Sequence, residues 1–160
     1  MLRGNSGSGK STLARALRAA RPRGVAIVGQ DQVRRELLHV HDEVDNTAVD
    51  LIDLTARFVL DRGLHAVLEG VFYSGIYGPM LSRLVADHRG ISRCYRFDVP
   101  FAETLRRHAT KPCAAEFGEP EMRRWWRDAD PIDSLDEHSF GAELGVDEAV
   151  RQIVLDCGWS

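Results

Sequence analysis

The chain has 160 residues, of which 44% are hydrophobic and 28% are charged, a balance that excludes a disordered or fibrous protein. Its net charge of −3 gives no strong field for coating nucleic acid, and no apolar run approaches the roughly 20 residues that a membrane-spanning helix needs. The three widely separated cysteines form no C-x-x-C motif, and no signal peptide precedes the first motif, so we expect a cytoplasmic protein without a membrane partner.

The first feature along the chain is a glycine-rich segment at residues 4–11, which reads G-N-S-G-S-G-K-S and matches G-x-x-x-x-G-K-[ST]. Its glycines allow positive φ angles that turn backbone N–H groups toward one point at the start of a helix, where a phosphate binds well. Lys10 is expected to reach the β- and γ-phosphates of ATP, and the Ser11 hydroxyl to ligate Mg²⁺. The predicted nucleotide-binding residues are Gly4, Asn5, Ser6, Gly7, Ser8, Gly9, Lys10, Ser11 and Thr12.

Apolar and amphipathic segments alternate along the rest of the chain. The clearest strands are expected at residues 25–28, 66–68 and 94–99, and helices at about residues 10–20, 31–38, 47–62, 79–88, 101–108, 119–128 and 147–157. This alternation predicts one doubly wound α/β domain over residues 1–160, with a mostly parallel sheet and helices on both faces. Only three residues precede the glycine loop, so the strand leading into it is either very short or begins further upstream.

The helix expected from Thr47 presents apolar residues at helical spacing. We expect its buried face to consist of Leu51, Leu54, Phe58 and Val59.

The residue pattern disfavours two other classes of protein with such a glycine loop. A GTPase needs a base-reading N-K-x-D motif, which the sequence lacks. Large ATPases usually carry an apolar strand that ends in Asp-Glu, together with a longer chain. A small kinase is therefore expected.

From Gly4 to about Arg127, the order of features resembles the phage-type polynucleotide kinase domain and its bacterial P-loop kinase relatives, which include chloramphenicol phosphotransferase and the zeta toxins. Besides the glycine loop, the segments that carry the resemblance are V-G-Q-D-Q-V-R-R at residues 28–35, V-L-E-G at residues 67–70 and the basic stretch at residues 97–111. The resemblance implies a five-stranded sheet, a short lid at about residues 107–120, and transfer of the ATP γ-phosphoryl group to a hydroxyl.

The resemblance also implies roles for individual residues. Asp31 would be the general base and Arg34 would hold an anionic group of the acceptor, although helix capping and a solvated surface position are the respective alternatives. Arg107 and Lys111 would be lid cations beside ATP, with a lysine standing where the polynucleotide kinase has an arginine. Glu69 would hold a Mg²⁺-bound water or a polar group of the acceptor, unless it is a plain surface carboxylate.

The expected acceptor is a small hydroxyl-bearing metabolite or an antibiotic-like molecule. One alternative is the 5′-hydroxyl of a nucleic acid, which the motif order favours and the net charge disfavours. The other alternative is a non-catalytic ATP-binding regulatory module. Of Trp125 and Trp126, one is expected to pack the lid onto the body of the domain.

Overall fold

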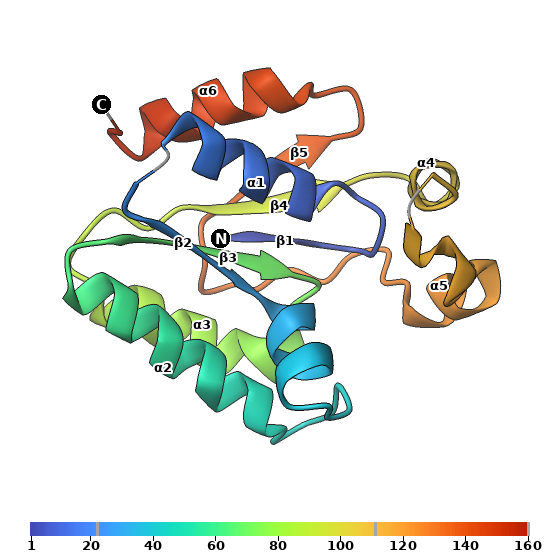
Figure 1. The fold of residues 1–160 in the computed structure, drawn as a ribbon, viewed down its shortest axis with the longest axis horizontal. Coiled ribbons are helices and arrows are strands. Elements are labelled where there is room, and N and C mark those ends of the chain that lie inside the picture. Colours follow the sequence, from blue (N-terminus) through green and yellow to red (C-terminus); the bar gives the residue numbers. More distant parts are fainter. Residues whose placement is uncertain (22, 111, 160) are drawn as a thin grey trace.

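The computed structural model describes residues 1–21, 23–110 and 112–159, and its centre is a five-stranded sheet (Figure 1). The strand order is β2-β3-β1-β4-β5, and all four neighbouring pairs are parallel. The strands are β1 (Leu2–Gly4), β2 (Val25–Gly29), β3 (His65–Gly70), β4 (Cys94–Asp98) and β5 (Glu137–Gly141). The five-stranded parallel sheet expected from the sequence is confirmed.

The strand that leads into the glycine loop is short and lies at the centre of the sheet. β1 has three residues, and Leu2 pairs with Glu69 of β3 on one side and with Tyr95 of β4 on the other. Because all strands are parallel, the glycine loop leaves the sheet at the same edge at which β2, β3 and β4 end. Ligands of open α/β sheets bind at this carboxyl edge.

Helices cover both faces of the sheet, as the sequence predicted (Figure 1). On one face lie α1 (Lys10–Ala20) and α6 (Val146–Asp156), and on the other lie α2 (Thr47–Asp61) and α3 (Ser74–Asp87). Each face has its own apolar core. The buried residues on the α1 side are Leu2, Leu13, Ala14, Leu17, Val67, Tyr95, Phe140, Ala149 and Ile153. Within the described part of the chain, no helix is both long and apolar enough to cross a membrane.

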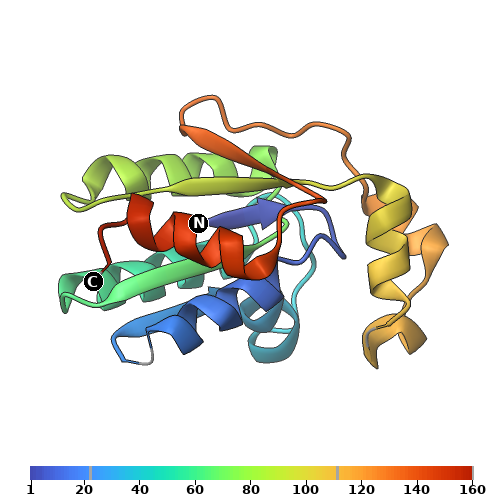
Figure 2. The ribbon, with the colours of Figure 1, turned by 90° about the horizontal axis from the view of Figure 1, so that it is seen from above.

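The remaining helical segments gather at the carboxyl edge. A π-helical turn, η1 (Gln32–Leu37), follows β2, while α4 (Phe101–His108), the short 3₁₀ turn η2 (Pro112–Ala115) and α5 (Glu119–Trp125) follow β4. Figure 2 shows α4 and α5 standing at one end of the molecule, away from the layered body.

The predicted buried face of α2 is wrong in part. Leu54 and Phe58 are 65% and 54% exposed, whereas Ala48, Ile52, Ala56 and Val59 are buried. The helix carries two apolar stripes at helical spacing. The stripe with two alanines is the one that packs inward, because small side chains let the helix approach the sheet and α3 closely.

The start of α3 also differs from the prediction, since the helix begins at Ser74 and contains Pro79 in its interior. The Asp130 carboxylate accepts hydrogen bonds from the backbone N–H and the hydroxyl of Ser74. This cap comes from a residue 56 positions away, so the sequence around the helix start does not contain it.

Candidate active site

The glycine loop between β1 and α1 packs tightly against β4 and α4. Gly4, Gly7 and Gly9 all have positive φ, at 144°, 81° and 110°. A Cβ atom would lie 2.8 Å from the Phe97 carbonyl oxygen at Gly4, and 2.6 Å from the Thr104 carbonyl oxygen at Gly7. Both the backbone conformation and the close approach therefore require glycine at these two positions.

The last residues of the loop connect it to itself and to β3. The Lys10 ammonium group donates to the Asn5 carbonyl oxygen at 2.8 Å and to the Ser8 hydroxyl at 3.3 Å, so its side chain curls across the loop. The Ser11 hydroxyl donates to the Glu69 carboxylate at 3.0 Å, at the end of β3. Lys10, Ser11 and Glu69 thus all lie at the carboxyl edge of the sheet and line the same cavity.

The Ser11–Glu69 pair has the chemistry of a magnesium site. A hydroxyl and a carboxylate are the oxygen donors that Mg²⁺ prefers, and this ion usually keeps several water ligands and shares phosphate oxygens of a substrate. Among the described residues, no group of three or more His, Cys, Asp or Glu side chains is placed to hold a metal by itself. The residues present fit a Mg²⁺ ion that arrives with a nucleotide, and do not form a closed protein cage.

A cavity of about 900 Å³, here called the first cavity, opens above the glycine loop. The loop and Glu69 line one end of it, and Leu144 and Val146 line another part. Its volume lies in the range typical of small-molecule and cofactor sites. It therefore offers a polar floor for phosphates and an apolar wall for the rest of a nucleotide.

Arg107 of α4 reaches the glycine loop from above. Its guanidinium donates to the Ser8 carbonyl oxygen at 3.0 Å, to the Ala142 carbonyl oxygen at 2.9 Å and to the Glu103 carboxylate at 2.6 Å. Hydrogen bonds from Arg106 and Arg107 lower the pKa of Glu103 to about 2. Glu103 therefore stays ionised at neutral pH and keeps the Arg107 guanidinium oriented toward the loop.

Asp31 follows β2 and has a largely exposed side chain. Its carboxylate accepts a hydrogen bond from the Arg34 guanidinium at 3.1 Å and makes no helix-capping hydrogen bond in the described structure. Arg34 also donates to the Val40 carbonyl oxygen at 3.3 Å, while its buried Nε has no hydrogen-bond partner. The capping role considered for Asp31 is therefore not realised, and Arg34 holds the carboxylate from one turn further along the chain.

A second cavity, of about 740 Å³, lies beside the first. Asp31, Arg34 and Arg35 line one side of it. Its lining also includes Tyr73, Phe117, Trp125, Trp126 and Arg127. The two cavities share part of their lining, so a group bound in the second cavity can face the phosphate end of the first. The shared residues are Ser6, Asp31, Arg35, Val71 and Phe117.

Comparisons with known proteins agree with this geometry. The model of a family described as an AAA domain matches residues 1–78, which contain the glycine loop, Asp31 and Glu69. The APS kinase of Mycobacterium tuberculosis, solved with AMPPNP and APS, superposes with a TM-score of 0.67 at 18% identity, over 97% of this chain and 94% of that chain. The chain has the P-loop kinase fold.

Two further solved structures share this P-loop kinase fold. A gluconokinase from Sinorhizobium meliloti superposes with a TM-score of 0.64 at 14% identity, over 98% of this chain and 89% of that chain. The tunicamycin resistance protein of Deinococcus radiodurans gives a TM-score of 0.63 at 15% identity, over 99% and 94% of the two chains. No curated protein sequence matches the chain.

The P-loop kinase fold brings most of the predicted site residues to one place. Those lining the first cavity are Ser6, Gly7, Ser8, Gly9, Lys10, Ser11, Thr12, Asp31, Glu69 and Arg107. Arg34 lines the second cavity only, and Gly4 and Asn5 lie beside the first cavity without lining it. Lys111 lies outside the described residues.

Two hydrogen-bond networks around buried side chains of this P-loop kinase fold were not predicted from the sequence. In one, Gln30 donates to the Asp42 carboxylate at 3.0 Å and accepts from the Phe72 backbone N–H at 2.9 Å, while the Tyr77 hydroxyl donates to Asp42 at 2.7 Å. Burial raises the pKa of Tyr77, and its hydrogen bond to Asp42 acts in the same direction. This network fixes the loops that follow β2 and β3 beside the second cavity. The only signal in the sequence was the position of Gln30 next to Asp31.

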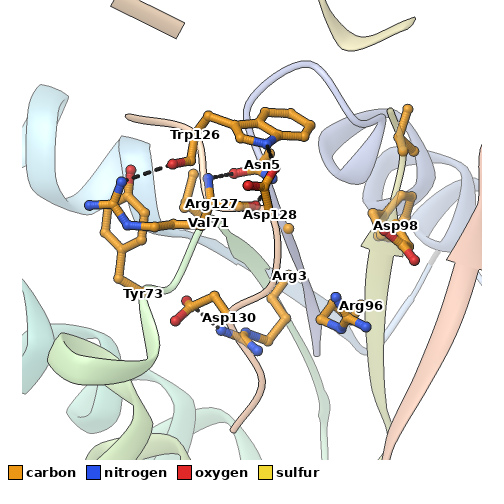
Figure 3. Close-up of a pocket in the computed structure, with 13 residues that line it drawn as sticks. Arg3, Asn5, Val71, Tyr73, Arg96, Asp98, Trp126, Arg127, Asp128 and Asp130 are labelled. Atoms are coloured by element: carbon orange, nitrogen blue, oxygen red, sulfur yellow. Dashed lines mark hydrogen bonds and ion pairs between the residues drawn. The ribbon is translucent and has the colours of Figure 1, made fainter. Parts of the chain in front are cut away.

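The other network surrounds Arg3, which is 2% exposed (Figure 3). Its guanidinium donates to the Glu137 carboxylate at 2.6 Å, and to the Asp130 carboxylate and the Phe72 carbonyl oxygen at 3.0 Å each. Figure 3 shows Arg3 and Asp130 facing one another beside a small cavity at the foot of the glycine loop. Arg3 therefore joins β1, the loop after β3 and the chain ahead of β5.

Proposed function

We propose that the protein is an ATP-dependent kinase that transfers the γ-phosphoryl group to a hydroxyl group of a small acceptor. One observation carries this proposal. Asp31 lies on the wall shared by two adjoining cavities, one floored by the P-loop and the other lined by side chains of mixed character. Such a position suits a carboxylate that takes a proton from an acceptor hydroxyl next to a bound γ-phosphate.

The nucleotide would occupy the first cavity. Backbone N–H groups of the P-loop and the Lys10 ammonium would neutralise the β- and γ-phosphates, and Arg107 would add a second cation above them. Ser11 and Glu69 would hold Mg²⁺, which supplies charge neutralisation at the phosphates when bound. The 3.0 Å contact between these two side chains supports the metal-side reading of Glu69 over the acceptor-side one.

The acceptor would occupy the second cavity, with its hydroxyl beside Asp31 and an anionic group near the Arg34 guanidinium, which lines the same cavity. Trp125 is 41% exposed and lines this cavity, where its ring packs edge-on against Phe117, so part of its surface could contact an acceptor. Trp126 packs edge-on against Phe101 of α4, with ring centroids 5.1 Å apart, so this contact joins the two ends of the proposed lid and does not join the lid to the body.

The size and lining of the second cavity support a small molecule, in the range of a metabolite or an antibiotic-like compound. The similar structures include a kinase of APS, a gluconokinase and a tunicamycin resistance protein, whose names point to small-molecule acceptors or to antibiotic resistance. A nucleic acid 5′-hydroxyl is the alternative, because Trp125 could stack on a base. The net charge of −3 disfavours it.

We further propose that residues 1–160 act as one unit, with α4 and α5 as the lid over both cavities. The predicted lid at residues 107–120 lies within this helical segment. Arg107 supports the assignment, since it hydrogen-bonds the P-loop from α4.

The test is an Asp31→Asn variant, which keeps the side-chain volume but removes the capacity to take a proton. Phosphorylation of a panel of hydroxyl compounds and of a 5′-hydroxyl oligonucleotide, followed by mass spectrometry, is expected to fall by about 10² to 10⁴. ATP affinity measured by calorimetry should stay near wild type. Asp61→Asn, at the exposed end of α2 and outside both cavities, is the matched control.

The outcomes separate the competing functions. Transfer to an acceptor by the wild type and its loss in Asp31→Asn support the kinase. ATP binding without transfer to any acceptor would instead favour a regulatory module. Unchanged transfer in Asp31→Asn would remove this residue from the chemistry.

A further inference from the structure

The segment of residues 125–127, which includes the last residue of α5 and the two that follow it, is here called the lid base. Its backbone is held to the body of the protein by three hydrogen bonds from two side chains. The Tyr73 hydroxyl donates to the Trp125 carbonyl oxygen at 2.8 Å. The Asn5 side-chain amide donates to the Arg127 carbonyl oxygen at 2.7 Å and accepts from the Arg127 N–H at 3.1 Å (Figure 3).

Asn5 is the second residue of the P-loop, where the sequence predicted a contact with the nucleotide. Both polar atoms of its side chain are engaged with Arg127 instead, and its carbonyl oxygen accepts a hydrogen bond from the Lys10 ammonium. A side-chain amide carries a donor and an acceptor side by side, so it can satisfy both polar groups of one residue's backbone. Aspartate at the same length has no donor when ionised.

The lid base forms a wall of the second cavity. Trp125, Trp126 and Arg127 all line it, and the Arg127 guanidinium lies 5.1 Å from the centroid of the Tyr73 ring. Asn5 therefore joins the loop that binds the phosphates to the wall that would face the acceptor. Both of its bonds to Arg127 run to backbone atoms, so the tie fixes the position of the segment rather than one side chain.

We propose that Asn5 is a positioning residue that fixes the lid base to the P-loop and so sets the distance between the acceptor and the transferred phosphoryl group. The kinetic part of this inference rests on the proposed kinase function, and the structural part does not. A displacement of about 1 Å in reacting groups can lower a rate by about 10²-fold. Loss of the two Asn5–Arg127 hydrogen bonds would therefore slow phosphoryl transfer if it lets the lid base move by such a distance.

The structural part is tested by hydrogen exchange in Asn5→Ala, Asn5→Asp and Tyr73→Phe. Asn5→Ala should raise exchange of the Arg127 N–H by on the order of tenfold or more, because its acceptor is lost. Asn5→Asp keeps an acceptor for that N–H and should show a smaller increase. Tyr73→Phe removes only the bond to Trp125, and the Asn5→Ala/Tyr73→Phe variant should loosen the whole lid base.

A second readout uses the tryptophans of the lid base. In a Trp159→Phe background Trp125 and Trp126 are the tryptophans left in the sequence, and Asn5→Ala should increase the acrylamide quenching of their fluorescence when tryptophan is excited selectively. Circular dichroism checks that each variant folds. If Asn5→Ala does not fold, Asn5→Asp carries the same comparison. Wild-type exchange and quenching in a folded Asn5 variant would overturn the proposal.

The kinetic part is tested with MgATP and with whichever panel compound the wild type phosphorylates. MgATP affinity of Asn5→Ala should stay within about twofold of wild type, while KM for the acceptor rises and kcat falls. A large loss of MgATP affinity with an unchanged lid base would make Asn5 a nucleotide ligand and overturn the inference. If no compound is phosphorylated, the kinase proposal fails. The exchange and quenching results would still show whether Asn5 holds the lid base to the P-loop.

Discussion

Replacing Gly7 with alanine tests the contact between the P-loop and α4. Gly7 has a φ of +81°, and a Cβ atom there would lie 2.6 Å from the carbonyl oxygen and 3.1 Å from the Cβ of Thr104. Thr104 is fully buried, so it has no free space into which to retreat. The substitution therefore combines an unfavourable backbone conformation with a steric clash.

The two effects have separable magnitudes. A left-handed backbone costs alanine about 1–2 kcal/mol relative to glycine. Overpacking in a tightly packed region costs typically about 1–3 kcal/mol. We expect Gly7→Ala to lower the free energy of unfolding by about 2–5 kcal/mol, the sum of these two ranges.

Gly63→Ala is the matched control for this prediction. Gly63 has a φ of +70°, and no atom of the described residues lies within 4 Å of a Cβ atom built there. Both variants share the backbone cost and the reduced entropy of the unfolded chain. Their difference in urea unfolding, followed by circular dichroism, should therefore isolate the clash at about 1–3 kcal/mol.

The same clash should affect ligand binding. If α4 shifts to relieve it, Arg107 loses its bond to the Ser8 carbonyl oxygen, and MgATP affinity measured by calorimetry falls in Gly7→Ala but not in Gly63→Ala. A Gly7→Ala variant that is no less stable than Gly63→Ala and binds MgATP as the wild type does would show that the P-loop does not pack against α4 in this way.

Three further predictions concern other parts of the protein. Arg107→Ala should lower kcat and kcat/KM by similar factors in steady-state kinetics, and a rise in the KM for ATP alone would contradict a transition-state role. Arg3→Met leaves Glu137 without its buried partner and should lower the free energy of unfolding by about 3–5 kcal/mol in urea titrations, with partial recovery in Arg3→Met/Glu137→Gln. Burial raises the pKa of the Cys94 thiol from 9.0 to about 11, so the folded state keeps the thiol protonated over a pH range in which the unfolded chain ionises it. The contribution of the buried neutral thiol to the free energy of unfolding is therefore fully present below pH 9 and is lost as pH rises toward 11. The stability of the wild type relative to Cys94→Ala should therefore fall by about 2–3 kcal/mol over that interval, and a constant difference would argue against the shift.

Part of the candidate site could be predicted from the sequence because its geometry is local. The P-loop requires positive φ at Gly4, Gly7 and Gly9, and a short motif specifies these conformations without help from distant residues. Parallel strands end at one edge of a sheet, so Asp31 and Glu69 could be expected near the loop from their positions at strand ends.

The alternation of apolar and amphipathic segments determined the fold class, since a parallel sheet needs helical crossovers on its faces. It could not determine which stripe of α2 packs inward. Leu54 and Phe58 lie one helical turn apart, as Ile52 and Ala56 do, so the sequence shows two apolar stripes of equal spacing. Only the packing of the helix against α3 and the sheet decides which stripe is buried.

Other features exist only in the tertiary structure. Asn5 and Arg127 are 122 residues apart, and Arg3 and Glu137 are 134 residues apart. The strand order β2-β3-β1-β4-β5 places β1 in the middle of the sheet, so its residues meet partners from the far end of the chain. A sequence pattern records periodicity within one element. It does not record which elements become neighbours, and these contacts depend on that choice.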